Sequence, residues 1–273
     1  MALFHSKGSG TLEVPSSQLE RSQLRQLIKK AAHGNLTAFT QLSSQYADLL
    51  SEYFYLLGYS NPVDRLFEIQ KLLADAWRYA SYVRRVSDFE RLLQILLEKR
   101  NALSPLNLGE PHECLGQLSH LERFLLVART FEAWSYKSIR LSLRKKKSEV
   151  STDLMQLKAK LIGFRISMLQ TQQQIQVLRL SELLEGQVNA KKLRGIENEI
   201  AGNYHVLHYK ADWLAYRCEL VELRQEMLLS SEEKNELKER LSVHLKQAPT
   251  ERPKLSDSII NQFSFVRLPA SAS

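Results

Sequence analysis

Three consecutive lysines and three hydroxyl side chains stand close together in this sequence and could bind an anion. They are Lys145, Lys146, Lys147, Ser148, Ser151 and Thr152. Lysine ammonium groups neutralise phosphates, and hydroxyl side chains at a helix N-terminus donate hydrogen bonds to them together with the free backbone amides. The segment therefore predicts a contact with nucleic acid. The charge by itself also fits a solvated lysine run between two structural helices.

A short helix, a turn and a second helix are expected to position these side chains. The sequence pattern predicts a helix from Ser135 to Leu143, then a turn, and then a helix that opens near Ser148. This is the order of elements in a helix-turn-helix, which lays its second helix in the major groove of DNA. Residues 113–163 hold 10 Lys and Arg against 5 Asp and Glu, so positive charge is concentrated around this motif.

Elsewhere the sequence lacks the motifs of common catalytic sites, such as a phosphate-binding glycine loop or a nucleophile elbow. His205 and His208 are three residues apart, as a metal-binding pair can be, but a polar helix face is the better explanation because no third ligand lies nearby. Cys114 and Cys218 lack ligand-spaced neighbours, which argues against a zinc site or disulfide scaffold and fits a reducing compartment. We expect a binding protein without enzymatic activity, metal or cofactor.

The composition favours an all-α fold. The chain has 273 residues, of which 44% are hydrophobic and 25% charged, and only 10 are Gly and 7 Pro. The net charge of +8 suggests an anionic partner. Residues 1–163 carry almost all of this excess, with 23 basic and 16 acidic side chains. The sequence has no apolar run long enough for a signal peptide or a membrane span, so we expect a cytoplasmic protein without a membrane partner.

Pro, Gly and Ser residues that mark turns and linkers divide the sequence into two small helical domains, followed by a long helical hairpin or coiled coil. The expected segments are a flexible leader (1–17), a helical domain (18–101), a linker (102–112), a helix-turn-helix domain (113–163), a helical hairpin (164–247) and a disordered tail (248–273). Apolar residues alternate in steps of three and four from Val150 to Leu178, which predicts one helix from near Lys147 to about Glu185. The expected hinge is Gly186 to Gly195.

The return arm of the hairpin is expected to use a seam of the same period. Its members are Leu207, Ala211, Leu214, Cys218, Val221 and Leu228, interrupted by Gln225. Ser230 and Glu233 form a capping-box pattern that predicts one more helix, from Ser231 to about Lys246. This segment predicts a docking arm for another protein, or a regulatory arm that covers one of the first two domains.

Two segments resemble a known family. Residues 118–154, which include FEAWSYKSI, resemble region four of the extracytoplasmic-function (ECF) sigma factors of bacterial RNA polymerase, with Phe131-Glu132 and Trp134-Ser135-Tyr136 on the family's motif positions. Residues 35–78 resemble region two, through LTAFTQLSSQYADLLSEYFYLLG and EIQKLLADAWR. The two segments follow in the family's order. Within the second, we expect Trp77 to pack in the core.

The resemblance implies a sigma factor that binds core RNA polymerase and promoter DNA to direct transcription initiation. It implies that region two contacts phosphates through Arg78, Arg84 and Arg85. Region four would read the promoter through the lysine and hydroxyl cluster at the start of its second helix. A further protein partner, such as an anti-sigma factor, would dock on the C-terminal hairpin.

Several positions depart from the family pattern. Leu66 and Phe67 replace the acidic pair that begins the family's polymerase-binding helix. Arg144 replaces the glycine of the turn, Asp153 stands where the recognition helix usually has an arginine, and Leu92 replaces an aromatic residue used in strand opening. These differences favour an alternative function: a helical regulator or scaffold with degenerate sigma folds, which acts through protein contacts.

Overall fold

The computed structural model describes residues 20–103, 113–186, 195–196, 198–200, 202–247 and 259. These residues form helices and contain no strand, so the prediction of an all-α fold is confirmed. The α-helices are α1 (Arg21–Ala32), α2 (Leu36–Ser44), α3 (Ala47–Leu56), α4 (Pro62–Arg78), α5 (Val86–Leu103), α6 (Glu113–Gly116), α7 (His120–Leu125), α8 (Tyr136–Leu143), α9 (Lys147–Leu161), α10 (Thr171–Leu184), α12 (Tyr204–Met227) and α13 (Ser231–Gln247).

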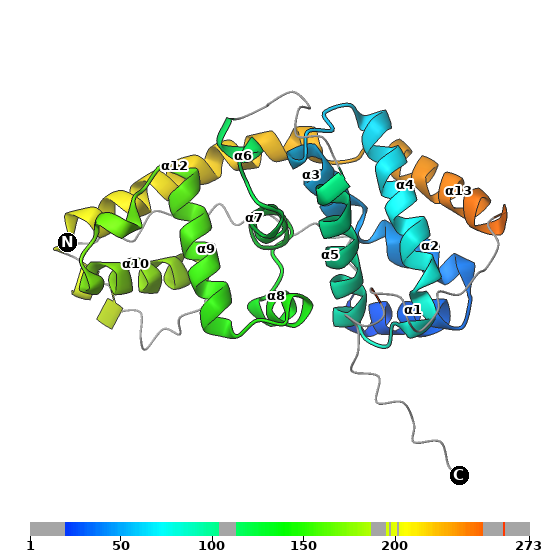
Figure 1. Cartoon of the computed structure of the whole chain (residues 1–273), viewed down its shortest axis with the longest axis horizontal. Coiled ribbons are helices and arrows are strands. Elements are labelled where there is room, and N and C mark those ends of the chain that lie inside the picture. The colour runs from blue at the N-terminus through cyan, green and yellow to red at the C-terminus, as the bar shows by residue number, and fades with distance from the viewer. Residues whose placement is uncertain are drawn as a thin grey trace, which may run out of the picture.

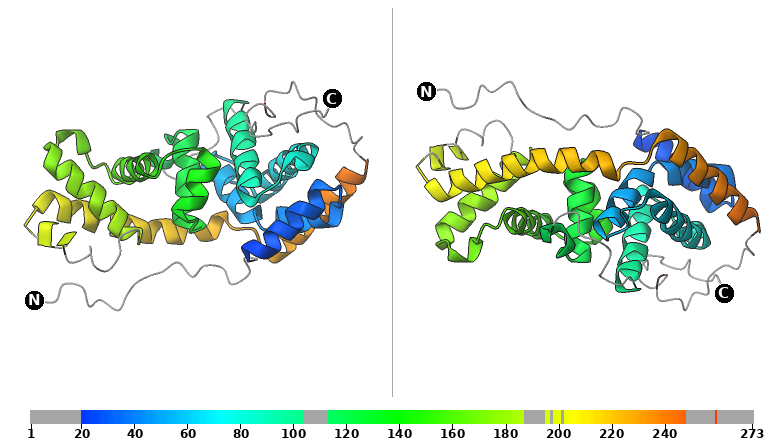
Figure 2. Two further views of the ribbon diagram at one scale, coloured as in Figure 1. Left: turned by 90° about the horizontal axis from the view of Figure 1, so that it is seen from below. Right: turned by 90° about the horizontal axis from the view of Figure 1, so that it is seen from above.

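The helices are arranged in an elongated molecule. Helices α1 to α5 and α13 lie at one end, α10 and the start of α12 lie at the other, and α7 and α8 lie between them (Figure 1). Three short turns of other helix types connect these elements: η1 (Ala80–Tyr82), the π-helical η2 (Leu126–Phe131) and η3 (Ile166–Met168). Helix α12 runs along one edge of the molecule, from the far end to α3 (Figure 2).

Side-chain caps set several helix starts as the sequence indicates. The Asn35 side chain accepts a hydrogen bond from the backbone N–H of Ala38 at the start of α2, and Asn61 caps α4, which begins at Pro62. Ser135 caps α8 by accepting from the N–H of Ser138. The expected short helix, turn and second helix are therefore present as α8, residues 144–146 and α9.

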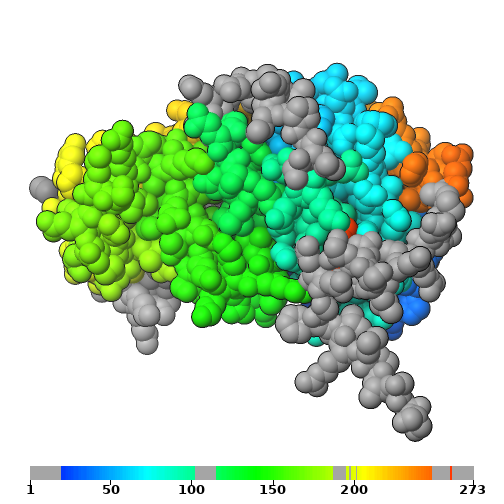
Figure 3. Space-filling view, in the orientation of Figure 1, coloured from blue at the N-terminus to red at the C-terminus, as the bar shows by residue number. Residues whose placement is uncertain are grey.

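One large apolar cluster runs through most of the molecule. It contains residues of α1 to α5, α7 to α9, α12 and α13, and Trp77 packs against it with its ring centroid 4.9 Å from that of Phe39. The expected core role of Trp77 is thus confirmed. Helix α5 packs against α8, and the surfaces of these two segments adjoin in Figure 3. The cluster therefore crosses the boundary expected at 102–112, whose residues 104–112 lie outside the described part of the chain.

The expectation of one helix from Lys147 to Glu185 is wrong. Helix α9 ends at Leu161, and Gly163 takes a left-handed conformation with φ +67°. Its N–H donates to the carbonyl of Lys160 at 3.2 Å, and the N–H of Phe164 donates to the carbonyl of Ala159 at 2.7 Å. This pair of bonds is the Schellman motif, which closes a helix at a glycine. Lys158 on α9 then pairs with Glu185 at 2.5 Å, at the end of α10.

The seam expected on the return helix is also wrong. In α12 the buried residues are Val206, Tyr209, Trp213, Leu220, Leu223, Arg224 and Met227. Leu207 and Leu214, expected in the seam, remain 45% and 40% exposed. Helix α12 packs on α10, α9 and α3 through a face that is offset by about one residue from the expected seam.

Helix α13 begins as the sequence predicts. Ser230 and Glu233 form the expected capping box, with the N–H of Glu233 bonded to Ser230 Oγ at 3.1 Å and the N–H of Ser230 bonded to Glu233 Oε2 at 2.7 Å. The helix packs against α2 and α4. In the described part of the chain, no helix has the length and apolar character needed to cross a membrane. The expected leader and tail (1–17, 248–258 and 260–273), and hinge residues 187–194, lie outside that part.

Candidate nucleic-acid interface

A basic groove of about 560 Å³ lies where the start of α5 meets the end of α8. Six of its lining side chains are basic and one, Asp88, is a carboxylate. The basic residues are Arg84, Arg85, Arg91, Arg140, Arg144 and Lys145. The groove thus brings together three of the residues predicted to bind DNA, from segments about sixty positions apart in the chain.

Asp88 organises the side of the groove formed by α5. Its Oδ2 accepts hydrogen bonds from the backbone N–H groups of Arg84 at 3.2 Å and Arg85 at 2.9 Å. The carboxylate therefore caps the start of the helix, where its charge also suits the helix dipole. The side chains of Arg84 and Arg85 are both exposed. They remain accessible to an anion in the groove.

The other side of the groove is the turn after α8. Arg144 adopts φ +56° and ψ +35°, so this arginine takes the left-handed conformation that glycine adopts most readily. The N–H of Lys145 bonds to the carbonyl of Arg140 at 3.1 Å and closes the turn. Lys145 also pairs with Asp153 at 2.5 Å. Asp153 therefore lies next to a cation of the turn, where it lowers the local positive charge.

Arg91 connects the two sides. It donates a hydrogen bond through Nη1 to the carbonyl of Ser142, at 3.3 Å, and another to the side chain of Gln94. Burial lowers the pKa of the Arg91 guanidinium, and the nearby charge of Arg144 lowers it further. Arg91 thus holds the end of α8 against α5 while adding positive charge to the floor between them.

The remaining predicted residues lie outside the groove lining. Lys146, Lys147 and Ser148 are exposed around the start of α9, and Thr152 is half-buried one turn later. Arg78 is exposed in the last turn of α4. These residues are accessible, but the structure does not bring Arg78 together with the groove.

Ser151 requires a correction. Its side chain is only 1% exposed, and its hydroxyl donates a hydrogen bond to Glu182 Oε1 at 2.8 Å. Glu182 belongs to α10, so this face of α9 is covered by the helix that follows the turn at Gly163. Ser151 therefore holds α9 to α10 and is not available to a base edge in this arrangement.

Sequence reasoning missed three groove residues: Arg91, Arg140 and Arg144. Arg140 and Arg144 are four residues apart in a predicted helix and its turn, a spacing that places them near one face. That signal was available in the sequence. The contribution of Arg91 depends on the packing of α5 against α8, which no local pattern indicates.

The groove can bind an anion mainly through side chains, because Asp88 already accepts from the backbone N–H groups of Arg84 and Arg85 at the start of α5. The end of α8 presents backbone carbonyls, which favour cations, so its basic residues supply the attraction to phosphate. Several arginines near one another can bind successive phosphates of a nucleic-acid backbone with a strong dependence on salt. The described residues include no group of three or more His, Cys, Asp and Glu placed to hold a metal ion.

Buried ion pairs from α12 hold the surrounding helices together. Arg224 donates to Glu52 Oε1 of α3 and to Glu132 Oε1 after η2, each at 2.6 Å. All three side chains are at most 5% exposed. Nearby, Ser51 donates to the carbonyl of Met227 at 2.6 Å. Helix α12 thus holds together the segments before and after the expected domain boundary.

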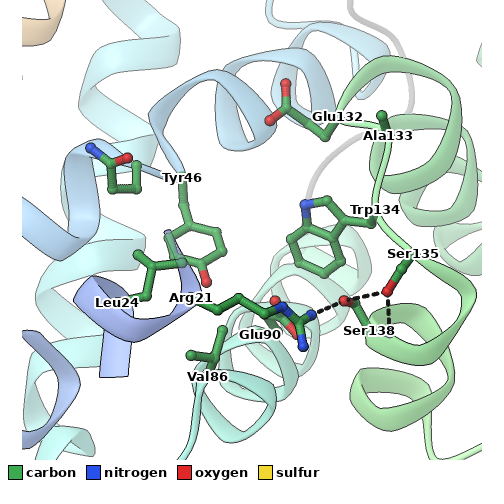
Figure 4. Close-up of a pocket in the computed structure, with 11 residues that line it drawn as sticks. Arg21, Leu24, Tyr46, Val86, Glu90, Glu132, Ala133, Trp134, Ser135 and Ser138 are labelled. Atoms are coloured by element: carbon green, nitrogen blue, oxygen red, sulfur yellow. Dashed lines mark hydrogen bonds between the residues drawn. The ribbon is translucent and has the colours of Figure 1, made fainter. Parts of the chain in front are cut away.

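A second, smaller cavity of about 200 Å³ lies between α1, α5 and the start of α8. Tyr46, Glu90, Trp134 and Ser138 surround it, and Arg21 crosses it to reach Ser138 (Figure 4). One oxygen of Glu90 is buried without a hydrogen-bond partner in the structure. Burial raises the pKa of Glu90 to about 7, and the nearby Arg21 only partly offsets this effect.

Comparison of the chain with protein-family models, with curated protein sequences and with solved structures finds no match. The groove and its residues are therefore the basis for assigning a function.

Proposed function

We propose that this protein is a sigma-like transcription factor that binds core RNA polymerase and promoter DNA, and that the basic groove contacts the DNA backbone. The observation that carries this proposal is the meeting of Arg84 and Arg85 with Lys145 around one groove. The resemblance assigns the first two to region two and the third to region four. A single duplex or strand could therefore contact both.

The proposed architecture divides the helices into three parts. Helices α1 to α5 correspond to region two, α6 to α9 to region four, and α10 to α13 to an added arm. The all-helical fold and the order of α8, turn and α9 support this division. The groove arginines would fix the position of the DNA by binding phosphates, because such contacts carry no sequence information.

The exposed residues at the start of α9 would recognise the DNA sequence. Lys147 and Ser148 are exposed and Thr152 is half-buried, so they are the candidates for contacts to base edges. Asp153 is paired with Lys145 at 2.5 Å, and this pairing reduces the repulsion between its carboxylate and the DNA backbone.

A helical regulator that acts through protein contacts is the second candidate. It is favoured by the burial of Ser151 against α10 and by Leu92, which is completely buried and cannot serve as an exposed wedge in strand opening. In this case the basic groove would bind an acidic surface of a protein partner.

Co-purification with core RNA polymerase, followed by measurement of promoter binding at several salt concentrations, tests the proposal. The sigma-like function predicts a stable polymerase complex and DNA affinity that falls steeply with salt. Reversing the charges of Lys145, Lys146 and Lys147 to Glu should weaken DNA binding for all sequences, while the same change at the distant Lys238 should not. Polymerase binding without a steep salt dependence on DNA would favour the regulator.

A further inference from the structure

Helix α12 carries an apolar stripe that the fold leaves exposed. Tyr204 is 73% exposed, Leu207 45% and Leu214 40%, and Ala211 and Cys218 are also exposed. The intramolecular contacts of α12 use a different face, which includes Val206, Tyr209 and Trp213. The helix is therefore apolar on two sides, whereas a helix that packs only within its own chain needs one apolar side.

The spacing of this stripe is that of a coiled coil. From Tyr204 to Cys218 the apolar residues follow in steps of 3, 4, 3 and 4, so they occupy successive a and d positions of a heptad repeat. No charged residue interrupts these positions. The stripe lies on a helix that runs along an edge of the molecule (Figure 2).

We propose that α12 pairs in parallel with α12 of a second copy of this chain. In this arrangement Arg217, at a g position, lies opposite Glu222 of the second copy, at the following e position, and the two-fold symmetry repeats the pair. An antiparallel arrangement instead places Lys210 opposite Arg217, two like charges. Charge complementarity thus selects both the occupant and its direction.

The proposed contact is small. The stripe covers two heptads, or about 20 Å of helix, because each residue adds about 1.5 Å. A contact of this length buries less surface than the interfaces of obligate dimers do. Dimerisation is therefore reversible, with a dissociation constant of roughly micromolar magnitude.

Sedimentation equilibrium of the full chain over a range of concentrations tests the association. The wild type should show a monomer–dimer equilibrium, and Leu214→Lys should weaken it at least about tenfold. Glu219→Lys changes an exposed residue at a b position and should leave the equilibrium unchanged. Circular dichroism should be the same for both variants. A wild type that stays monomeric up to about 100 µM, or equal association of the two variants, would overturn the proposal.

The direction of pairing has its own test. A parallel pair places the exposed Cys218 side chains of two copies in one layer, so mild oxidation of the wild type should give a covalent dimer that is absent in Cys218→Ser. Glu222→Lys should weaken association, and the double variant Arg217→Glu with Glu222→Lys should restore it. If the dimers do not cross-link through Cys218, or if the charge variants associate as the wild type does, the parallel arrangement is contradicted.

Discussion

At the scale of single residues, the most consequential side chain is Arg224. It lies on α12 and is paired with two buried carboxylates from segments 92 and 172 positions away. Burial raises the pKa of Glu52 and of Glu132, and the charge of Glu132 raises that of Glu52 further. Arg224 lowers both pKa values but offsets these effects only in part. The guanidinium therefore offsets part of the free-energy cost of burying two carboxylates.

Replacing Arg224 with Met should destabilise the protein by about 3 to 5 kcal/mol, because two buried carboxylates lose their counter-charge. Urea unfolding at neutral pH measures this. The loss should shrink at lower pH, where the carboxylates can bind protons. Arg240→Met, which removes an exposed pair with Glu236, should cost less than about 1 kcal/mol. Similar losses for the two variants would contradict the proposed role of Arg224.

Glu90 gives a separate pH prediction. Its pKa in the folded protein is about 7, above the value of 4.5 for an unperturbed carboxyl. The folded state therefore holds a proton that the unfolded state has released, so stability falls as the pH rises from about 4.5 through 7. Glu90→Gln should remove part of this fall, by up to about 3 kcal/mol at pH 8.

Unfolding measured at pH 5 and pH 8 checks the effect of Glu90. The stability difference between the two pH values should be smaller in Glu90→Gln than in the wild type. The exposed Glu239→Gln serves as the control and should not change the difference. If Glu90→Gln and the wild type respond equally to pH, the raised pKa of Glu90 is wrong.

At the scale of elements, two left-handed residues set the ends of α8 and α9. Arg144 carries a side chain in a conformation that costs an L-residue about 1 kcal/mol, whereas Gly163 adopts it without that cost. Arg144→Gly should therefore stabilise the protein by roughly 0.5 to 1 kcal/mol, and Gly163→Ala should destabilise it by about 1 kcal/mol. Thermal unfolding distinguishes them by opposite shifts in the midpoint. Shifts of the same sign would contradict this account of the two turns.

The helix starts could be predicted because their signals are local. Asn61 with Pro62, Ser135, and Ser230 with Glu233 each cap a helix where the sequence indicates it. The end of α9 was missed because the apolar alternation continues past Gly163. Gly163 ends the helix there, because it adopts the left-handed conformation that closes α9. The heptad pattern shows only which residues are apolar, and it does not show where the helix ends.

The groove was predicted only in part, for a different reason. Lys145 and its neighbours form a local cluster, and Arg84 and Arg85 were suggested by the resemblance. Their meeting depends on the packing of α5 against α8, to which Arg91 contributes a hydrogen bond to Ser142. The covering of Ser151 by α10 likewise follows from tertiary packing. Long-range contacts of this kind leave no periodic signal in the sequence.

At the scale of the whole molecule, the C-terminal helices are part of the main core. Trp213, Leu220 and Met227 of α12, with Leu237 and Leu241 of α13, belong to the same apolar cluster as α1 to α5. Removing them would expose the apolar surface of α2 to α4 and leave Glu52 and Glu132 without Arg224. We therefore expect helices α12 and α13 to be needed for the stability of the fold.

A chain truncated after residue 165 should lose cooperative unfolding, since both apolar cover and a buried counter-charge are removed. Truncation after Ser230, which removes only α13 and the residues beyond it, should be milder because Arg224 remains. Calorimetry of both chains measures the difference. A cooperative transition in the 1–165 chain with the stability of the full chain would contradict a shared core.

The most direct test of the central claim is the salt dependence of DNA binding when charge is removed from either side of the groove. Arg84→Ser with Arg85→Ser, and Arg140→Ser with Lys145→Ser, should each reduce the slope of log affinity against log salt by about 2. Lys238→Ser with Lys246→Ser, on α13, should not change it. If either groove pair leaves the slope at the wild-type value, the two sides do not bind DNA together and the account is wrong.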